Sequence, residues 1–213
     1  MNYNKVMEEK IETILKSGEV PRILLHSCCA PCSTHVIDTL SPCFDITVLY
    51  YNPNIEPYEE YEKRKQEEVR FISEYQAKNK LDILDVQHEN ELFREMARGL
   101  EDVPEGGARC IKCYYLRMEK TAKLAREHGY DYFATTLTVS PLKNSQKLND
   151  IGRILSEQYG IQYLYSDFKK KEGYKHSIEM ARVYDLYRQD YCGCVFSKEQ
   201  REKEKREKLG NIE

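Results

Sequence analysis

Cysteine is the residue type with the most chemistry in this sequence, because seven of the eight cysteines fall in three short clusters. The first cluster is His26-Ser27-Cys28-Cys29-Ala30-Pro31-Cys32, which follows an apolar run and precedes an amphipathic segment. We expect a strand to pass into a helix here, at the position where open α/β sheets usually bind a ligand. The backbone N–H groups and the dipole of such a helix favour thiolate over thiol.

Two cysteine pairs elsewhere in the chain also have the spacing of metal ligands. Cys110 and Cys113 are three residues apart at the expected start of a helix, so both thiols face the same side. Gly193, between Cys192 and Cys194, lets the backbone turn tightly around a metal. We therefore predict a metal site on which all seven clustered thiols converge.

Seven thiols exceed the four that one zinc ion takes. Cys28 and Cys29 are adjacent, and because neighbouring side chains diverge in regular structure, we expect them to serve two metals or a metal and a substrate. Thiolate ligands favour zinc or iron–sulfur over magnesium or calcium. A four-iron cluster on three cysteines with a second metal beside it accounts for seven thiols, and two structural zinc ions do nearly as well. Cys43 stands apart, and we expect it to pack as a small apolar side chain.

Other residues at the same expected edge are candidates for the site. His26 can hold a cysteine ligand in place, although a histidine at a strand end is more often hydrogen-bonded core. Asp167 follows a predicted strand and can give a metal an oxygen ligand, with a helix cap or turn acceptor as the equal alternative. We expect a basic rim around this site from Lys143 and the run Lys169–Lys171, with an ordinary solvated surface as the equal alternative.

Short β-branched and apolar runs alternate with helical patterns along the chain. Strands are expected at residues 21–27, 45–51, 81–86, 132–139 and 161–165. Helices are expected at residues 5–16, 33–40, 58–79, 91–100, 110–128, 148–159 and 177–189. This alternation predicts right-handed βαβ units and an α/β fold with a mainly parallel sheet of about five strands flanked by helices, with a helical C-terminal part. We expect one α/β domain over residues 1–196 and a charged helix or tail over residues 197–213, to which we assign no function.

Composition narrows the class of protein. A chain of 213 residues with a formal net charge of −3 is long enough for one domain and has no global basic footprint for nucleic acid. The N-terminus lacks the apolar core of a secretory signal, and no apolar run is long enough to span a bilayer. We therefore expect a cytoplasmic protein with no membrane partner. Disulfides are rare in that compartment, so the clustered thiols favour metal binding.

Taken together, the motifs resemble the QueH family of cobalamin-independent epoxyqueuosine reductases. The segments that carry the resemblance occur in order between about residue 21 and residue 197, and they are His26–Cys32, Tyr50–Ile55, Arg109–Tyr114, Thr138–Ser145 and Leu186–Cys194. The family is similar to the adenine nucleotide α-hydrolase-like (HUP) Rossmann-type fold of tRNA-thiolating enzymes. Those enzymes carry a Ser-Gly-Gly-x-Asp-Ser phosphate loop, whereas this chain has Ser-Cys-Cys-Ala-Pro-Cys there, so we expect no ATP chemistry.

The resemblance implies a reaction on tRNA. The epoxide of epoxyqueuosine at the wobble position is reduced to an alkene with loss of water, which takes two electrons and two protons. The resemblance also implies a 4Fe-4S cluster with an additional iron or other divalent metal, no cobalamin, and an external low-potential electron donor. An open iron acts as a Lewis acid on the epoxide oxygen, and the thiols are its ligands. The ligands expected are the clustered cysteines and Asp167, namely Cys28, Cys29, Cys32, Cys110, Cys113, Cys192, Cys194 and Asp167.

A wobble base must leave the anticodon stack to reach a buried metal, so we expect stacking and phosphate-binding groups around the site. The candidates are Tyr51, Asn52, Asn54, Lys143, Asn144, Lys169, Lys170, Lys171 and Arg188. Two other functional classes stay open. One is an iron–sulfur enzyme of tRNA sulfur transfer on the same scaffold, against which the missing phosphate loop argues. The other is a zinc-stabilised RNA-binding module.

Overall fold

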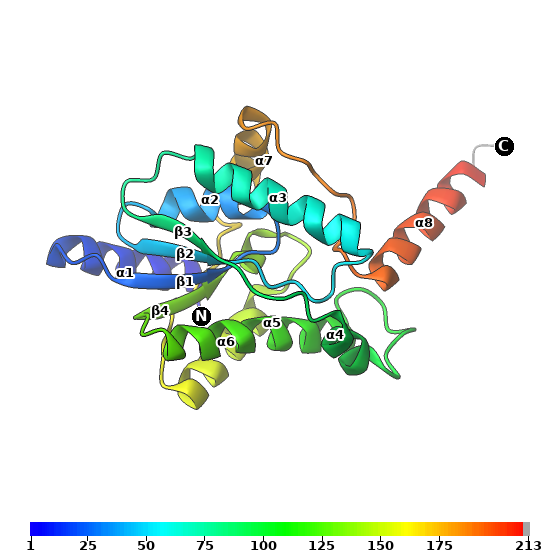
Figure 1. The fold of residues 1–213 in the computed structure, drawn as a ribbon, viewed down its shortest axis with the longest axis horizontal. Coiled ribbons are helices and arrows are strands. Elements are labelled where there is room, and N and C mark those ends of the chain that lie inside the picture. The colour runs from blue at the N-terminus through cyan, green and yellow to red at the C-terminus, as the bar shows by residue number, and fades with distance from the viewer. Residues whose placement is uncertain (211–213) are drawn as a thin grey trace.

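A parallel sheet forms the centre of the structure, a computed structural model that describes residues 1–210 (Figure 1). Its strands are β1 (Arg22–His26), β2 (Asp45–Leu49), β3 (Leu81–Leu84), β4 (Tyr132–Thr135) and β5 (Gln162–Tyr163). The five strands lie in the order β3-β2-β1-β4-β5, and every pairing is parallel. The predicted α/β class with a parallel five-stranded sheet is confirmed.

Helices cover both faces of this sheet (Figure 1). They are α1 (Tyr3–Ser17), α2 (Ala30–Leu40), α3 (Tyr58–Glu74), α4 (Asn90–Ala97), α5 (Ala108–Glu127), α6 (Ser145–Tyr159), α7 (Gly173–Val183) and α8 (Val195–Gly210), with a 3-10 turn, η1, at Thr136–Val139. The side chains of β1 alternate between two cores. Ile23 and Leu25 pack with α1, α2, α3 and α7 on one face, whereas Leu24 packs with α5 and α6 on the other.

The central strand β1 marks the point where the strand order reverses. β2 and β3 extend the sheet on one side of β1, and β4 and β5 extend it on the other. In sheets of this kind the crevice outside the carboxyl ends of the strands, at the reversal point, is the ligand position. The cysteine loop follows β1 directly, and the Cys28 N–H donates to Thr136 Oγ1 at 3.3 Å, just past the end of β4. The fold therefore places the first cysteine cluster in this crevice.

Several elements are shorter than the sequence predicts. The pattern predicts one strand over residues 132–139, but only Tyr132–Thr135 is a strand. Thr135 Oγ1 accepts a hydrogen bond from the Leu137 N–H at 3.2 Å, and this cap turns the chain into η1. The predicted helix over residues 177–189 begins at Gly173 and ends at Val183, because the chain reverses direction at Asp185, which has a positive φ of 47°.

α8 projects from the body of the molecule, and it carries most of the charged residues of the predicted C-terminal helix or tail (Figure 1). Residues 211–213 of the predicted tail lie outside the described residues. Within residues 1–210, no helix combines the length and the apolar character that crossing a bilayer requires.

Candidate metal centre

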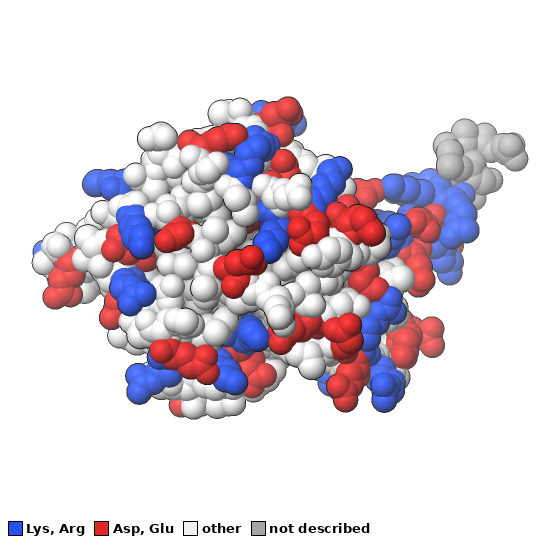
Figure 2. All heavy atoms as spheres, viewed as in Figure 1, with Lys and Arg blue, Asp and Glu red and all other residues white. Residues whose placement is uncertain are grey.

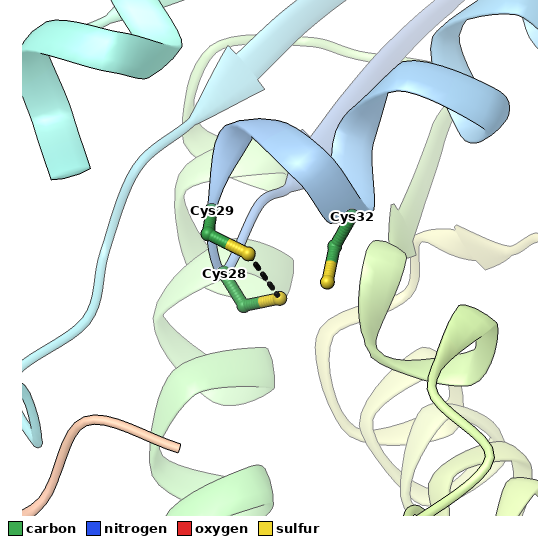
Figure 3. Close-up of side chains that lie close together, drawn as sticks. All are labelled: Cys28, Cys29 and Cys32. Atoms are coloured by element: carbon green, nitrogen blue, oxygen red, sulfur yellow. Dashed lines mark hydrogen bonds between the residues drawn. The ribbon is translucent and has the colours of Figure 1, made fainter. Parts of the chain in front are cut away.

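Three of the predicted thiols gather where β1 passes into α2 (Figure 3). The Sγ atoms of Cys28, Cys29 and Cys32 all lie within 4.8 Å of one another, and those of Cys28 and Cys29 are 3.9 Å apart. We call this group the three-thiol cluster. Cys29 is the N-cap of α2 with an extended backbone, φ −178° and ψ 156°, and Pro31 occupies the first turn. At this junction the adjacent thiols of Cys28 and Cys29 turn towards each other, so the expectation that they diverge is wrong.

The three-thiol cluster cannot carry three negative charges by itself. Hydrogen bonds from Cys29 and Cys32 lower the pKa of the Cys28 thiol well below its ordinary value. The same interactions raise the pKa of the Cys29 and Cys32 thiols, and burial raises both further. One thiolate is therefore stable beside two thiols, and a bound cation allows the other two to ionise. This donor set fits a thiophilic metal such as iron or zinc.

The other four clustered thiols line a second cavity, which we call the four-thiol cavity. α5 supplies Cys110 and Cys113, and the segment just before α8 supplies Cys192 and Cys194. Cys192 also lines the open cavity over the three-thiol cluster, which we call the cluster cavity. The structure thus brings all seven thiols to two adjoining cavities that share Cys192. Their roles as metal ligands stay a prediction.

Backbone N–H groups support two of the thiols in the four-thiol cavity. Gly106 N–H donates to Cys110 Sγ at 3.2 Å, and Ser197 N–H donates to Cys194 Sγ at 3.4 Å. Such contacts favour the thiolate, while burial raises the pKa of the Cys110 and Cys194 thiols. Cys43, by contrast, is buried in the core beside α2, and its thiol donates to Leu40 O at 3.4 Å.

Gly193 allows the backbone between Cys192 and Cys194 to turn close to α3. Its φ is 125°, and a Cβ at this position would lie 2.8 Å from Ile55 Cγ1 and 3.1 Å from Arg64 Nη1. Arg64 is buried in α3, pairs with Glu60 at 2.7 Å, and donates from Nη1 to Cys192 O at 3.3 Å. The permissive glycine expected from the sequence therefore has a definite cause, because helix α3 lies directly against this turn.

A buried arginine contacts the end of the strand that carries the cysteine loop. Arg117 lies on α5 and lines the cluster cavity, and its Nε donates to His26 Nε2 at 3.2 Å. A guanidinium has only donors, so His26 Nε2 accepts, and the ring proton lies on Nδ1, 2.9 Å from Thr135 Oγ1. Burial and the charge of Arg117 lower the pKa of His26 to about 3. His26 is therefore a neutral, hydrogen-bonded core residue, the more common of the two readings of a histidine at a strand end.

The loop after β2 is tied to the same arginine. Arg117 Nη2 donates to Asn52 Oδ1, and Asn52 Nδ2 donates to Ser27 O at 2.9 Å. Tyr51, Asn52 and Asn54 are each only 1% exposed. The structure therefore does not bring these three residues to the surface as a base-stacking rim. Asn52 holds the cysteine loop in place instead, and Asn54 lines the four-thiol cavity.

The basic residues predicted for the site divide into two groups. Lys143 and Arg188 line the cluster cavity. Burial opposes the charge of Lys143, but the neighbouring thiols of Cys192, Cys28 and Cys32, where they are ionised, outweigh it and raise the pKa of this lysine. Asn144 lies next to Lys143 and is the N-cap of α6, where its side chain accepts from Lys147 N–H at 3.1 Å.

The second group lies at a separate cavity beside α1. Asp167 forms an ion pair with Lys169 at 2.7 Å. Lys170 and Lys171 line a separate cavity with the first residues of α1, and Lys171 pairs with Glu8. The structure therefore does not bring Asp167 or the run Lys169–Lys171 together with the thiols, because the loop that carries them packs towards α1.

Glu68 is a buried carboxyl group behind the cysteine loop. The sequence did not predict it as part of the site. It lies on the buried side of α3 with Tyr61 and Arg64, and its Oε2 accepts from Ser27 Oγ at 3.0 Å. Burial raises the pKa of Glu68 to about 7, and hydrogen bonds from Ser33 and Ser27 oppose this shift only in part. Glu68 lies on the same helical face as Tyr61, and this spacing was the sequence signal for its burial.

Replacing Glu68 by Gln is expected to flatten the dependence of stability on pH. The unfolded carboxyl group loses its proton near pH 4.5, whereas the folded one keeps it until about pH 7. The folded state binds more protons in that window, so stability falls as pH rises through it, by about 2.5 kcal/mol between pH 5 and pH 8. Glutamine does not titrate and removes this loss. Urea unfolding of both proteins at the two pH values measures the difference.

Glu67→Gln is the matched control, because hydrogen bonds from Arg70 and the Tyr187 N–H outweigh burial and lower the pKa of Glu67. That variant should not remove the loss of stability. Identical pH profiles for Glu68→Gln and the parent protein would show that Glu68 ionises normally in the fold.

A parallel sheet with this order, and with thiols gathered in the crevice beside β1, defines an α/β protein with a cysteine site able to hold a metal. Among solved structures, the U34-tRNA thiolase NcsA from Methanococcus maripaludis with its [4Fe-4S] cluster matches with a TM-score of 0.51 and 13% identity, over 91% of this chain and 67% of that chain. A predicted subunit of tRNA methyltransferase from Methanocaldococcus jannaschii matches with a TM-score of 0.50 and 12% identity, over 76% and 74%. At these identities the likeness shows the fold alone, the predicted Rossmann-type α/β arrangement.

The family is shown by closer relatives. The family model for epoxyqueuosine reductase QueH matches residues 23–200. The epoxyqueuosine reductase QueH of Staphylococcus epidermidis is 44% identical, over 92% of this chain and 84% of its own length. Those of Streptococcus pyogenes and Thermotoga maritima are 46% and 35% identical, over 92% and 85% of this chain and 78% and 93% of their own lengths. The chain belongs to the epoxyqueuosine reductase QueH family, as its motifs predicted.

Proposed function

We propose that this protein is an epoxyqueuosine reductase that acts on the wobble nucleotide of tRNA. In this reaction the epoxide takes up two electrons and two protons, both C–O bonds of the ring break, and an alkene and one water form. The observation that carries the proposal is the three-thiol cluster in the ligand crevice of a chain of this family. The electrons come from an external low-potential donor, and neither cobalamin nor ATP takes part.

The thiols fit the metal centre that such a reduction needs. We assign three corners of a 4Fe-4S cluster to Cys28, Cys29 and Cys32, the closest of the thiols. We assign an additional iron to the adjoining thiols of the four-thiol cavity, with Cys192 between the two sites. Such a centre supplies single electrons and a Lewis-acidic iron for the epoxide oxygen.

Side chains of the cluster cavity can bind the substrate around that centre. Lys143 carries a positive charge that is held by the neighbouring thiolates, so it favours negative charge on the departing epoxide oxygen. Tyr174 is 38% exposed, and Tyr191 lines the same cavity. Their rings can stack on a base that has left the anticodon, the role that the sequence assigned to the buried Tyr51.

The reduction is expected to proceed without ATP or any other nucleotide cofactor. Phosphate loops bind ATP through free backbone N–H groups at a helix start. At the start of α2, Pro31 has no N–H, and the Cys32 and Ser33 N–H groups donate to Cys29 O at 3.0 and 3.1 Å. Incubation of the iron-loaded protein with an epoxyqueuosine-containing anticodon stem-loop and a low-potential reductant should therefore give queuosine.

Nucleoside chromatography of the digested RNA measures this product, and adding ATP should leave the rate unchanged. Product that forms only when ATP is present would mean that the loop after β1 binds phosphate after all. No product under either condition, from protein with a full complement of iron, would overturn the proposed function.

A further inference from the structure

The sequence of α8 places a row of basic side chains along one side of the helix. This helix projects from the body in Figure 1, and Figure 2 shows basic side chains gathered on it. The row consists of Lys198, Arg201, Lys205 and Lys208. Their spacing of three, four and three residues places them within an arc of about 80° on the helix, and the four glutamates of α8 fall outside that arc. We call these four residues the basic row. α8 holds six basic and four acidic residues, so it is net positive in a chain whose net charge is −3.

The basic row begins at the mouth of the cluster cavity. Arg201 lines that cavity. Lys205 forms an ion pair with Asp190, which lines the same cavity. Lys208 lies about 10 Å further out than Arg201 along the helix axis, at about 1.5 Å per residue. The row is therefore continuous with the basic lining of the cavity, to which Lys143 and Arg188 belong.

The first turn of α8 is packed against the body, which fixes the direction of the row. Phe196 lies 6.3 Å from Phe93 between ring centroids, and the Arg109 guanidinium stacks 4.4 Å above the Phe196 ring. The buried Ser197 donates its N–H to Cys194 Sγ at 3.4 Å. The helix axis is thus anchored directly at the four-thiol cavity, and the exposed part of the row points away from it into solvent.

We propose that the basic row binds the phosphate backbone of the RNA strand that flanks the nucleotide in the cluster cavity. This inference rests on the proposed function, because it requires a nucleotide in that cavity. The strand must leave the cavity at its mouth, where the row begins, and each phosphate carries a negative charge that basic side chains attract. The row spans about 15 Å from Lys198 to Lys208, long enough to face several consecutive phosphates. An acidic electron-donor protein is the competing occupant.

The test compares two double variants with the same change in net charge. Lys198→Glu/Lys208→Glu reverses the two members of the row that have no part in lining the cavity. Lys203→Glu/Arg206→Glu reverses two exposed basic residues of the same helix that lie outside the row. Circular dichroism checks that both variants keep the helix. Fluorescence anisotropy then measures binding of an epoxyqueuosine-containing anticodon stem-loop over a series of salt concentrations.

The Lys198/Lys208 variant is expected to bind the stem-loop at least about tenfold more weakly at low salt. The slope of log affinity against log salt should fall by about 1.4, or about 0.7 for each lost contact with a single strand. The Lys203/Arg206 variant should retain the parent affinity and slope. Equal affinity and slope in both variants would overturn the proposal.

Two further outcomes separate this inference from the proposed function. Unchanged RNA binding by the Lys198/Lys208 variant, with slower reduction only when a protein supplies the electrons, would assign the row to the electron donor and overturn the proposal. Failure of the iron-loaded parent protein to reduce the free epoxyqueuosine nucleoside or the stem-loop would overturn the proposed function, whatever the RNA affinities are.

Discussion

Cys32→Ala is expected to abolish reduction and to remove the iron that we assign to the three-thiol cluster, without unfolding the protein. The cluster has only three protein thiols, and loss of one leaves two ligands to hold the metal. Removing a residue that merely supports a metal ligand costs about 10–100-fold in metal affinity or activity, so loss of a ligand should cost more than about 100-fold. Alanine also suits this position, because residue 32 lies in the first turn of α2. Iron analysis, visible absorption and activity of anaerobically purified protein measure the effect.

Cys43→Ala is the matched control. Cys43 is 1% exposed and packs in the core away from both thiol cavities. Its loss should lower the free energy of unfolding by about 1 kcal/mol and leave iron content and rate intact. Full iron content and activity in Cys32→Ala would remove the three-thiol cluster from the proposed centre. A parent protein that holds about two zinc ions and no iron would end the iron–sulfur proposal.

Arg117→Met is expected to lower the free energy of unfolding by about 3–5 kcal/mol, the usual cost of removing one partner of a buried charged network. Arg117 is 1% exposed, and methionine leaves His26 Nε2 and Asn52 Oδ1 without their donors. Among the described residues, no carboxylate pairs with this guanidinium, and the thiols of Cys113 and Cys28 supply the nearby negative charge. The activity should fall as well, because Arg117 lines the cluster cavity.

Lys120→Met on the same helix serves as the control, since Lys120 forms a half-exposed pair with Glu89 at 3.0 Å. Pairs of this kind contribute about 0–1 kcal/mol. Urea unfolding of the two variants and the parent protein measures both effects. An Arg117→Met protein within 1 kcal/mol of the parent, on the order of the surface-pair cost, would show that water or relaxation satisfies the network.

The sequence predicts the fold well because the pattern that it carries is local. Each β-branched run, such as Ile46–Leu49, is followed by a helical stripe, and that alternation is enough for a parallel sheet. The element ends depend on single contacts that periodicity does not contain. Thr135 shows this, because its side chain ends β4 by capping the next turn. Asp185 shows it again, because its positive φ turns the chain after α7.

The site is predicted unevenly, and residue type explains why. Clustered cysteines are easy to recognise in a sequence, because in one chain they usually bind a metal or do redox chemistry. Arg117 follows Cys110 and Cys113 on the same helical face, but a charged residue on a helix is usually exposed, so nothing in the pattern marks it as buried. The run Lys169–Lys171 lies apart from the thiols for a different reason. Its position is decided by packing against α1, a contact between segments far apart in the sequence.

The sharing of Cys192 between the two cavities has a consequence for how the protein matures. Cys28 and Cys29 are separated in the sequence from the turn that carries Cys192 and Cys194 by most of the α/β domain. Closing so long a loop costs entropy that only contacts formed afterwards can repay. The seven thiols therefore come together only after that turn has packed against α3 through the Arg64 contact with Cys192 O, so the shared cavity is completed late in folding.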